Sequence, residues 1–294
     1  MRIGIVSPIL TRVPGGHSEW ETTAGIEELG RIAEVADRLG FHHLTCSEHV
    51  AVPIDVAEQR GGTYWDPLPT LGYLAARTRR IRLVTQVLVV GYHHPLAIAK
   101  RYGTLDRVSG GRLTLGLGVG SLREEFDLLG APFEDRGPRA DEAIAAVRAG
   151  LSTPKPEYHG SYYDFADVLV EPHAVQPRVP IWIGGRTRRS LRRAVSQGDG
   201  WVPFGLRPED MADMLAAAAP PAGFEVVLPS GRPVDPLGDP AATERVLCRL
   251  RDAGATVVGA GITATSVEHY CDQLASLTEL ARRLGLDHAP EADR

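Results

Sequence analysis

An acid and an imidazole stand side by side in the stretch 42-HHLTCSEHVAV-52, where an apolar run with the composition of a buried strand ends. A carboxylate next to an imidazole could carry out proton transfer, because the ordinary pKa of histidine lies close to neutrality. Glu48 and His49 are therefore candidate catalytic residues. The same pair could also be a salt-bridged polar exit from a protein core, and the residue types alone leave both interpretations open.

Two glycine-rich segments follow other apolar runs and could bind an anion. They are 116-GLGVG-120 and 184-GGRT-187. Glycines let backbone N–H groups approach an oxyanion, and Thr187 opens a predicted helix whose amino end favours negative charge. Arg186 and Arg188 add positive charge. Taken alone, the first segment lacks the third glycine of the dinucleotide-binding fingerprint and is also typical of simple strand–loop packing.

Aromatic side chains in the predicted loops could cover a substrate. Trp20, Tyr64 and Trp65 lie after the first two predicted strands, and Tyr92 and His93 follow the third. Rings at such positions could line a pocket for a flat or apolar molecule. They could equally pack the loops or face solvent.

Neither the paired histidines nor the cysteines predict a metal or redox site. Adjacent side chains on a strand point to opposite faces, so His42 and His43 cannot chelate one ion together. The cysteines Cys46, Cys248 and Cys271 are far apart and form no C-x-x-C pair. We expect packed free thiols and no bound metal.

The elements that must position these residues alternate along the whole chain. Eight predicted strands each precede a segment with helical periodicity, which is typical of parallel strands joined by helical crossovers. The predicted strands are 2–7, 43–48, 81–89, 112–118, 180–185, 200–204, 223–228 and 255–261. The predicted helices are 25–40, 67–80, 95–111, 138–151, 187–198, 207–219, 239–254 and 266–285. We therefore expect an α/β fold, a closed (β/α)8 TIM barrel, with an open doubly wound sheet as the alternative.

Two irregular segments, 119–137 and 152–179, lie between the fourth and fifth predicted strands. The second is rich in proline and aromatic residues and is too long for a simple connection. We predict that it is an insertion over the active-site face. The chain 1–294 is predicted to be one domain with a frayed tail at 286–294.

Length, composition and charge fit this expectation and exclude other classes of protein. The 294 residues suit a barrel of about 250 residues with insertions. The net charge of −5 forms no basic field, which argues against nucleic acid as the main partner. No apolar run approaches the roughly 18 to 20 residues of a membrane span, and no export signal precedes the first predicted strand. We expect a cytoplasmic protein.

In a TIM barrel the C-terminal ends of the strands form one mouth, where catalytic and binding groups gather. Glu48 and His49 lie at that end of the second predicted strand. We expect the same mouth to hold Ser7, Thr85, Gln86, Gly118, Gly120, Ser121, Gly184 and Gly185.

Several blocks of the sequence occur together in an order that carries a resemblance. They are SEH at 47–49, the run 81–126, 136-RGPRADE-142, 158-YHGSYYDF-165 and 180-PIWIGGRTRRSLRRAVSQGDGWVP-203. With them the chain resembles the bacterial luciferase-like superfamily and, within it, the branch that uses the deazaflavin coenzyme F420. The resemblance implies a TIM barrel that holds a flavin or deazaflavin at its mouth, with the substrate above the ring.

The resemblance also implies roles for individual residues. Glu48 and His49 take the place of an Asp-His pair that contacts the ring and acts in proton transfer, and glutamate keeps the carboxylate with a longer reach. A non-prolyl cis peptide that backs the ring is expected at Thr85–Gln86 or one bond to either side. The residues implied to hold the ribityl chain and phosphate are Gly118, Val119, Gly120, Ser121, Ile183, Gly184, Gly185, Arg186 and Thr187.

The expected function is that of an F420-dependent oxidoreductase, which transfers a hydride between the deazaflavin and a small organic substrate. His49 would donate or accept a proton, and Glu48 would hold the tautomer of His49 or the ring edge. Arg186 would clamp the phosphate, while Arg192 and Arg193 would lie on the surface.

Two alternatives remain open. One is an FMN-dependent monooxygenase that uses reduced flavin and O2 and needs a partner flavin reductase. The other is a non-catalytic barrel that binds flavin without turnover. Family members are often dimers, so we also expect a homodimer.

Overall fold

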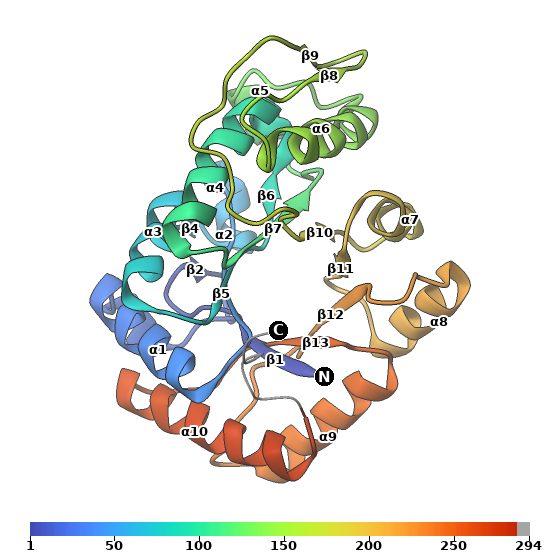
Figure 1. Ribbon diagram of the computed structural model, residues 1–294. Helices are drawn as coiled ribbons and strands as arrows, with labels where there is room; N and C mark the ends of the chain where they lie inside the picture. The colour runs from blue at the N-terminus through green and yellow to red at the C-terminus, as the bar shows by residue number, and fades with distance from the viewer. Residues whose placement is uncertain (287–294) are drawn as a thin grey trace.

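Eight parallel strands close into a barrel in the computed structural model, which describes residues 1–286 (Figure 1). The pairing order is β10-β11-β12-β13-β1-β3-β5-β7, and β7 also pairs with β10, which closes the ring. The barrel strands are β1 (Arg2–Ile5), β3 (His43–Cys46), β5 (Arg82–Thr85), β7 (Leu113–Gly118), β10 (Ile181–Gly184), β11 (Gly200–Val202), β12 (Glu225–Pro229) and β13 (Val257–Ala260). The predicted TIM barrel is confirmed, and all eight predicted strands take part in it.

Eight helices surround the barrel at the positions that the sequence predicted (Figure 1). They are α1 (Ile26–Leu39), α3 (Pro67–Arg77), α4 (Pro95–Ser109), α6 (Arg136–Leu151), α7 (Arg188–Gln197), α8 (Pro208–Ala218), α9 (Pro240–Asp252) and α10 (Val267–Arg283). Their ends follow capping chemistry: Gly40 ends α1 in the left-handed conformation, with φ 84°. Of the tail predicted to fray, Leu286 is buried, and 287–294 lie outside the described residues.

Several short elements were not predicted. Helices α2 (Ile54–Arg60) and α5 (Arg123–Leu128) lie in the segments after β3 and β7. Strand β2 (Thr11–Arg12) pairs antiparallel with β4 (Thr63–Tyr64), which ties together the segments after β1 and β3. The predicted strand 81–89 is divided into β5 and β6 (Leu88–Val89), and a 3-10 turn at Val90–Tyr92 follows it. A second 3-10 turn spans Glu19–Thr22. These pieces are too short to show a clear periodicity.

The insertion 152–179 packs along the outside of two helices. It contains the two-stranded pair β8 (Tyr158–His159) and β9 (Asp164–Phe165), which lies beside α6 (Figure 1). Glu142 of α6 accepts hydrogen bonds from the amides of Tyr162 and Tyr163, both at 2.7 Å. Asp106 of α4 accepts hydrogen bonds from the amides of Val175 and Gln176, at 2.9 and 3.0 Å. One partly buried and one buried carboxylate, Glu142 and Asp106, therefore hold the backbone of a segment that has little regular structure.

Apolar residues form two separate cores because side chains alternate across the barrel wall. The larger core lies between the strands and the helices. The inner core consists of Val84, Trp182, Val202, Val227 and Val257. Polar groups accompany it: the indole N–H of Trp182 donates to Glu225 Oε2 at 2.6 Å.

Other sequence expectations concern cysteines, metals and membranes. Cys46 is buried, Cys248 and Cys271 are partly buried, and all three are free thiols. Among the described residues, no group of three or more His, Cys, Asp or Glu side chains could hold a metal ion. Within the same part of the chain, no helix combines the length and the apolar character needed to cross a membrane.

Candidate active site

A cleft of about 880 Å³ opens at the C-terminal ends of the barrel strands. Its lining comes from the segments after β1, β3, β5, β7, β10 and β11, so distant parts of the sequence meet there. The predicted residues that line it are Glu48, His49, Gln86, Gly118, Val119, Gly120, Ser121, Gly184, Gly185, Arg186 and Thr187. None of the described lining residues belongs to 152–179, and that this insertion covers the active-site face stays a prediction.

Two predicted cofactor-binding residues are buried in the strands rather than placed on the cleft surface. Thr85 has no exposed surface, and its hydroxyl donates to the carbonyl of Gly116 at 2.8 Å. Ile183 is also fully buried and packs in the core between strands and helices. Each directly precedes a lining residue, and consecutive side chains of a strand point in opposite directions.

His49 is held by a carboxylate that the sequence analysis did not single out. Its Nδ1 lies 2.6 Å from Oε2 of Glu125 in α5. Oε1 of Glu125 accepts from the amides of Val50, at 2.6 Å, and Ala51, at 3.2 Å. The hydroxyl of Tyr92 donates to Oε2 at 2.8 Å. Glu125 thus fixes both the ring of His49 and the backbone that follows it.

The charge state of Glu125 determines which nitrogen of His49 can act. Burial raises the pKa of Glu125, but hydrogen bonds from His49, Tyr92 and the backbone outweigh it and hold the pKa below its ordinary value. An ionised carboxylate only accepts hydrogen bonds, so Nδ1 of His49 carries the proton facing it. Nε2 is then the ring nitrogen left to exchange a proton with a molecule in the cleft.

The sequence contains a weak signal for Glu125. Leu122, Glu125 and Phe126 have the spacing i, i+3 and i+4, which places them on one face of the short helix α5. All three are buried, with exposed fractions of 4%, 0% and 0%. An acid on the apolar face of an amphipathic helix requires a partner, and here that partner is His49.

The prediction that Glu48 holds the tautomer of His49 is wrong. Oε1 of Glu48 lies 2.7 Å from Nε2 of His93, and Oε2 accepts from the amide of Val89 at 2.7 Å. The side chain of Glu48 is nearly buried and borders the cleft from the end of β3. Glu48 therefore orients His93, and its contact with the ring edge of a cofactor stays a prediction.

Two of the five candidate rings line the cleft; His93, which Glu48 holds, is not among the lining residues. Tyr64 and Tyr92 are lining residues, and the ring of Tyr64 lies edge-on to His49 with 4.4 Å between centroids. Trp20 and Trp65 pack against the core instead. The aromatic walls of the cleft therefore lie next to the candidate proton-transfer group.

Val87 and two glycines form a wall that has no room for further side chains. A Cβ atom at Gly118 would lie 2.5 Å from a methyl of Val87, and one at Gly184 would lie 2.7 Å from the other methyl. The peptide bond Gln86–Val87 is cis, one bond after Thr85–Gln86 and within the predicted range. The close approach requires glycine on both neighbouring strands and leaves bare backbone facing the cleft.

The amino end of α7 forms one side of the cleft. Thr187 caps the helix, because its side chain accepts a hydrogen bond from the amide of Ser190 at 3.1 Å. Gly185 has φ 143°, and a Cβ there would lie 2.6 Å from Cβ of Ser190. The glycine is required for the chain to enter the helix at this angle, and the remaining first-turn amides can bind an anion.

Three arginines complete a basic rim around that helix end. Arg136, Arg186 and Arg189 all line the cleft. The guanidinium of Arg136 stacks on Phe133, 3.7 Å from the ring centroid, and that of Arg186 lies 6.0 Å from the centroid of Phe204. Cation–π contacts hold these groups in place without neutralising their charge.

Arg193 differs from the prediction that placed it on the surface. It is 7% exposed and forms an ion pair with Asp141 of α6, while Nη2 donates to the carbonyl of Gly137 at 3.2 Å. Arg192 is exposed, as predicted. Arg188 is also exposed and is outside the residues that line the cleft.

A TIM barrel with an imidazole–carboxylate pair and a basic, glycine-lined rim in one cleft has the architecture of a cofactor-dependent enzyme. Residues 1–230 match the family described as luciferase-like monooxygenase. The chain belongs to this family and is an oxidoreductase.

Relatives by sequence include a flavin-dependent monooxygenase and a mycobacterial protein. The chain is 29% identical to the oxygenase component of the flavin-dependent trigonelline monooxygenase of Acinetobacter baylyi, over 58% of this chain and 46% of that protein. An uncharacterized Mycobacterium tuberculosis protein is 31% identical over 63% of this chain and 68% of its own length.

Solved structures share the fold along almost the whole chain. The monooxygenase RslO1 from Streptomyces bottropensis has a TM-score of 0.76 at 25% identity, covering 97% of this chain and all of that one. An F420-dependent secondary alcohol dehydrogenase has a TM-score of 0.73 at 15% identity, covering 95% of this chain and 97% of that one, which shows the fold alone. Among these proteins, the trigonelline monooxygenase is named as flavin-dependent and the alcohol dehydrogenase as F420-dependent.

Proposed function

We propose that the chain binds coenzyme F420 in the cleft and catalyses hydride transfer between F420 and a small organic substrate. The observation that carries this proposal is the meeting of the His49–Glu125 pair with the basic rim in one cleft. When bound, F420 supplies a carbon that gives or takes a hydride, so the protein must supply placement and a proton.

The residues present fit such a cofactor. Val87 and the bare backbone at Gly118 and Gly184 would back a flat ring, because side chains are sterically excluded there. The segments Gly118–Ser121 and Gly184–Thr187 offer backbone amides to a ribityl chain and a phosphate. The arginines of the rim offer more positive charge than a single phosphate requires, which favours F420 with its additional carboxylates.

The chain's own residues then divide the work. His49 holds its Nδ1 proton towards Glu125 and presents Nε2 to the substrate oxygen or nitrogen that gains or loses a proton. Tyr92 keeps Glu125 in place, and the ring of Tyr64 packs edge-on against the imidazole. These contacts limit the positions His49 can take, as an efficient proton transfer requires.

A second candidate function has its own support. The trigonelline relative is named as a flavin-dependent oxygenase component, and it matches more than half of this chain. By that analogy the cleft would bind FMN, the reaction would use O2, and a separate reductase would provide reduced flavin. The same backbone wall and rim would bind the flavin ring and its phosphate.

Titration with oxidised F420 and, separately, with FMN distinguishes the two candidates. Ligand fluorescence and the thermal midpoint of the protein are the readouts. We expect saturable binding of F420 with a rise in the midpoint, and weaker or no binding of FMN. A clear preference for FMN would overturn the F420 proposal in favour of oxygen chemistry. Binding of neither would favour a barrel without a flavin-type reaction.

A further inference from the structure

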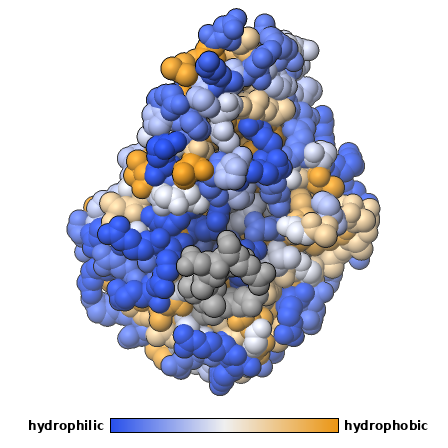
Figure 2. All heavy atoms as spheres, in the orientation of Figure 1, coloured by the Kyte–Doolittle hydropathy of each residue, from blue (hydrophilic) through white to orange (hydrophobic). Residues whose placement is uncertain are grey.

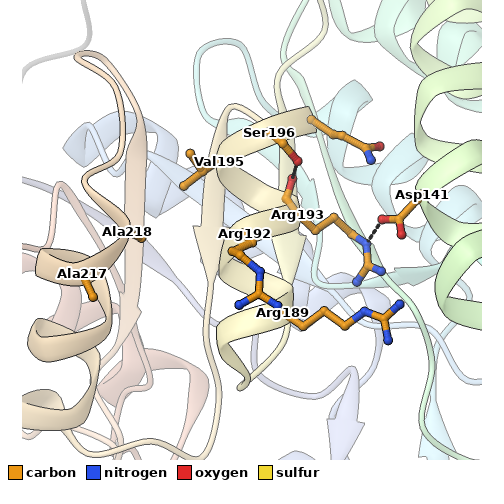
Figure 3. Close-up of a pocket in the computed structure, with 9 residues that line it drawn as sticks. Asp141, Arg189, Arg192, Arg193, Val195, Ser196, Ala217 and Ala218 are labelled. Carbon is orange, nitrogen blue, oxygen red and sulfur yellow. Dashed lines mark hydrogen bonds and ion pairs between the residues drawn. The ribbon is translucent and has the colours of Figure 1, made fainter.

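A shallow hollow of about 600 Å³ spreads over the exposed face of α7, beside the cleft (Figure 3). Asp141 of α6 bounds it on one side, and Ala217 and Ala218 of α8 bound it on the other. Arg189 and Arg193 line both the hollow and the cleft. The hollow therefore adjoins the basic rim of the cleft at these two arginines.

The hollow carries an excess of positive charge. Asp141, the acid among its described lining residues, already pairs with Arg193. Arg189 and Arg192 are exposed and form no ion pair within the described part of the chain. The side towards α8 is neutral and apolar, and Figure 2 shows apolar surface over that helix. A bound molecule would meet two free guanidinium groups and no free carboxylate.

The sequence of α7 is unfavourable for an isolated helix. Arginines occupy positions 188, 189, 192 and 193, and the first turn contains no acidic residue. Positive charge at the amino end opposes the helix dipole, and arginines three or four positions apart repel each other. A negatively charged molecule lying against this face would relieve both effects.

We propose that the hollow binds the chain of glutamates that F420 carries beyond its phosphate, and that Arg189 and Arg192 thereby select F420 over FMN. This inference rests on the proposed function. FMN ends at its phosphate, whereas F420 continues with one free carboxylate or more per glutamate. Arg189 lies where the cleft meets the hollow and Arg192 lies further along α7, so successive carboxylates meet them in this order.

The test compares F420 that has no glutamate with F420 that has several, using deazaflavin fluorescence to measure Kd. For the wild-type protein at low salt, the form with several glutamates is expected to bind about fivefold or more tightly, as exposed ion pairs allow. About 0.5 M salt should remove most of this advantage by screening. Arg192→Glu should abolish the advantage and leave the Kd of the glutamate-free form within about twofold.

A matched variant controls for the overall change of charge. Arg245 is an exposed arginine of α9, away from the residues that line either cavity, and Arg245→Glu changes the net charge by the same amount. We expect it to keep the advantage of the longer ligand.

The outcomes separate this inference from the proposal on which it rests. Equal binding of both F420 forms by the wild type, or an advantage that persists in Arg192→Glu, overturns the tail site and leaves the F420 proposal standing. Binding of FMN with no binding of either F420 form overturns both.

Discussion

The two ends of strand β3 each carry a histidine, and their surroundings are opposite. His43 begins the strand and has no exposed surface. Burial, together with the nearby positive charges of Arg2 and Arg82, lowers its pKa to about 3. Its ring fills the space that a Cβ on Gly4 would need and lies edge-on to Trp182, with 5.3 Å between centroids. His43 is therefore a neutral packing group.

His49 lies just beyond the other end of the same strand and borders the cleft. The buried carboxylate of Glu125 accepts a hydrogen bond from its Nδ1–H, and its other ring nitrogen is left for a ligand. The difference teaches that a histidine's role is set by what surrounds it. Cations and apolar neighbours keep an imidazole neutral, whereas a carboxylate beside an open cleft prepares it for proton transfer. In a TIM barrel, residues at the N-terminal ends of the strands contribute to stability, and residues at the C-terminal ends form the active site.

The largest effect is expected from removing the imidazole at the cleft. His49→Ala should lower kcat/KM about 10²- to 10⁴-fold, since it deletes a proton-transfer group, and should leave cofactor affinity largely intact. Steady-state kinetics together with the fluorescence titration measure the two effects separately. Unchanged turnover would show that His49 takes no part in the chemistry. The contrast in role between His43 and His49 would then be wrong.

Removing the charge of Glu125 tests the support of that imidazole. Glu125→Gln should lower kcat/KM about 10²-fold, because an amide can hold His49 in the wrong tautomer and position. Glu124→Gln is the matched control, since Glu124 is the exposed neighbour one position earlier. Similar kinetics for both variants would show that Glu125 only packs α5 against the barrel. The pH–rate profile should also change in Glu125→Gln alone.

Crowding the buried histidine should affect stability and not chemistry. Gly4→Ala places a methyl group on the ring of His43 and should lower the free energy of unfolding by about 1–3 kcal/mol. Gly72→Ala in α3 is the control, because its added Cβ would meet no heavy atom within 4 Å apart from its chain neighbours and the backbone of its own helix, and it should stabilise by about 0.5–1 kcal/mol. Urea unfolding measures both. Equal stability of the two variants would contradict the packing role of His43.

The pH dependence of stability gives the smallest and most specific signal. His43 stays neutral in the folded protein down to about pH 3 but is protonated in the unfolded chain below about pH 6.5. The unfolded state then binds more protons, so stability falls as the pH falls, by about 1.4 kcal/mol per pH unit for one histidine. His42, whose pKa burial also lowers, adds to this slope.

Urea unfolding at several values between about pH 7.5 and 5 measures the slope. His43→Gln should flatten it by about one proton, whatever the absolute stability of that variant. A slope that stays the same would mean that other groups produce it.

Much of the fold could be predicted because its long elements show a clear periodicity of apolar residues in the sequence. All eight barrel strands and their helices show apolar runs or helical spacing, with glycine, proline and hydroxyl residues at the ends. The short helices α2 and α5 show no such periodicity, since six or seven residues contain fewer than two full turns. The path of 152–179 depends on single carboxylates of α4 and α6 that accept its amides. Such contacts have no periodicity.

The sequence alone determined which segments become strands and which residues stand at their ends, because alternation and helical spacing are local properties. It therefore placed Glu48, His49 and both glycine loops at one mouth. Only the tertiary structure decided which groups touch there. Glu48 contacts His93, and Arg193 forms an ion pair with Asp141. His49 contacts Glu125, which lies 76 positions away in the sequence. Pairing between distant side chains depends on how the barrel closes and on which groups its loops bring within hydrogen-bond distance of each other.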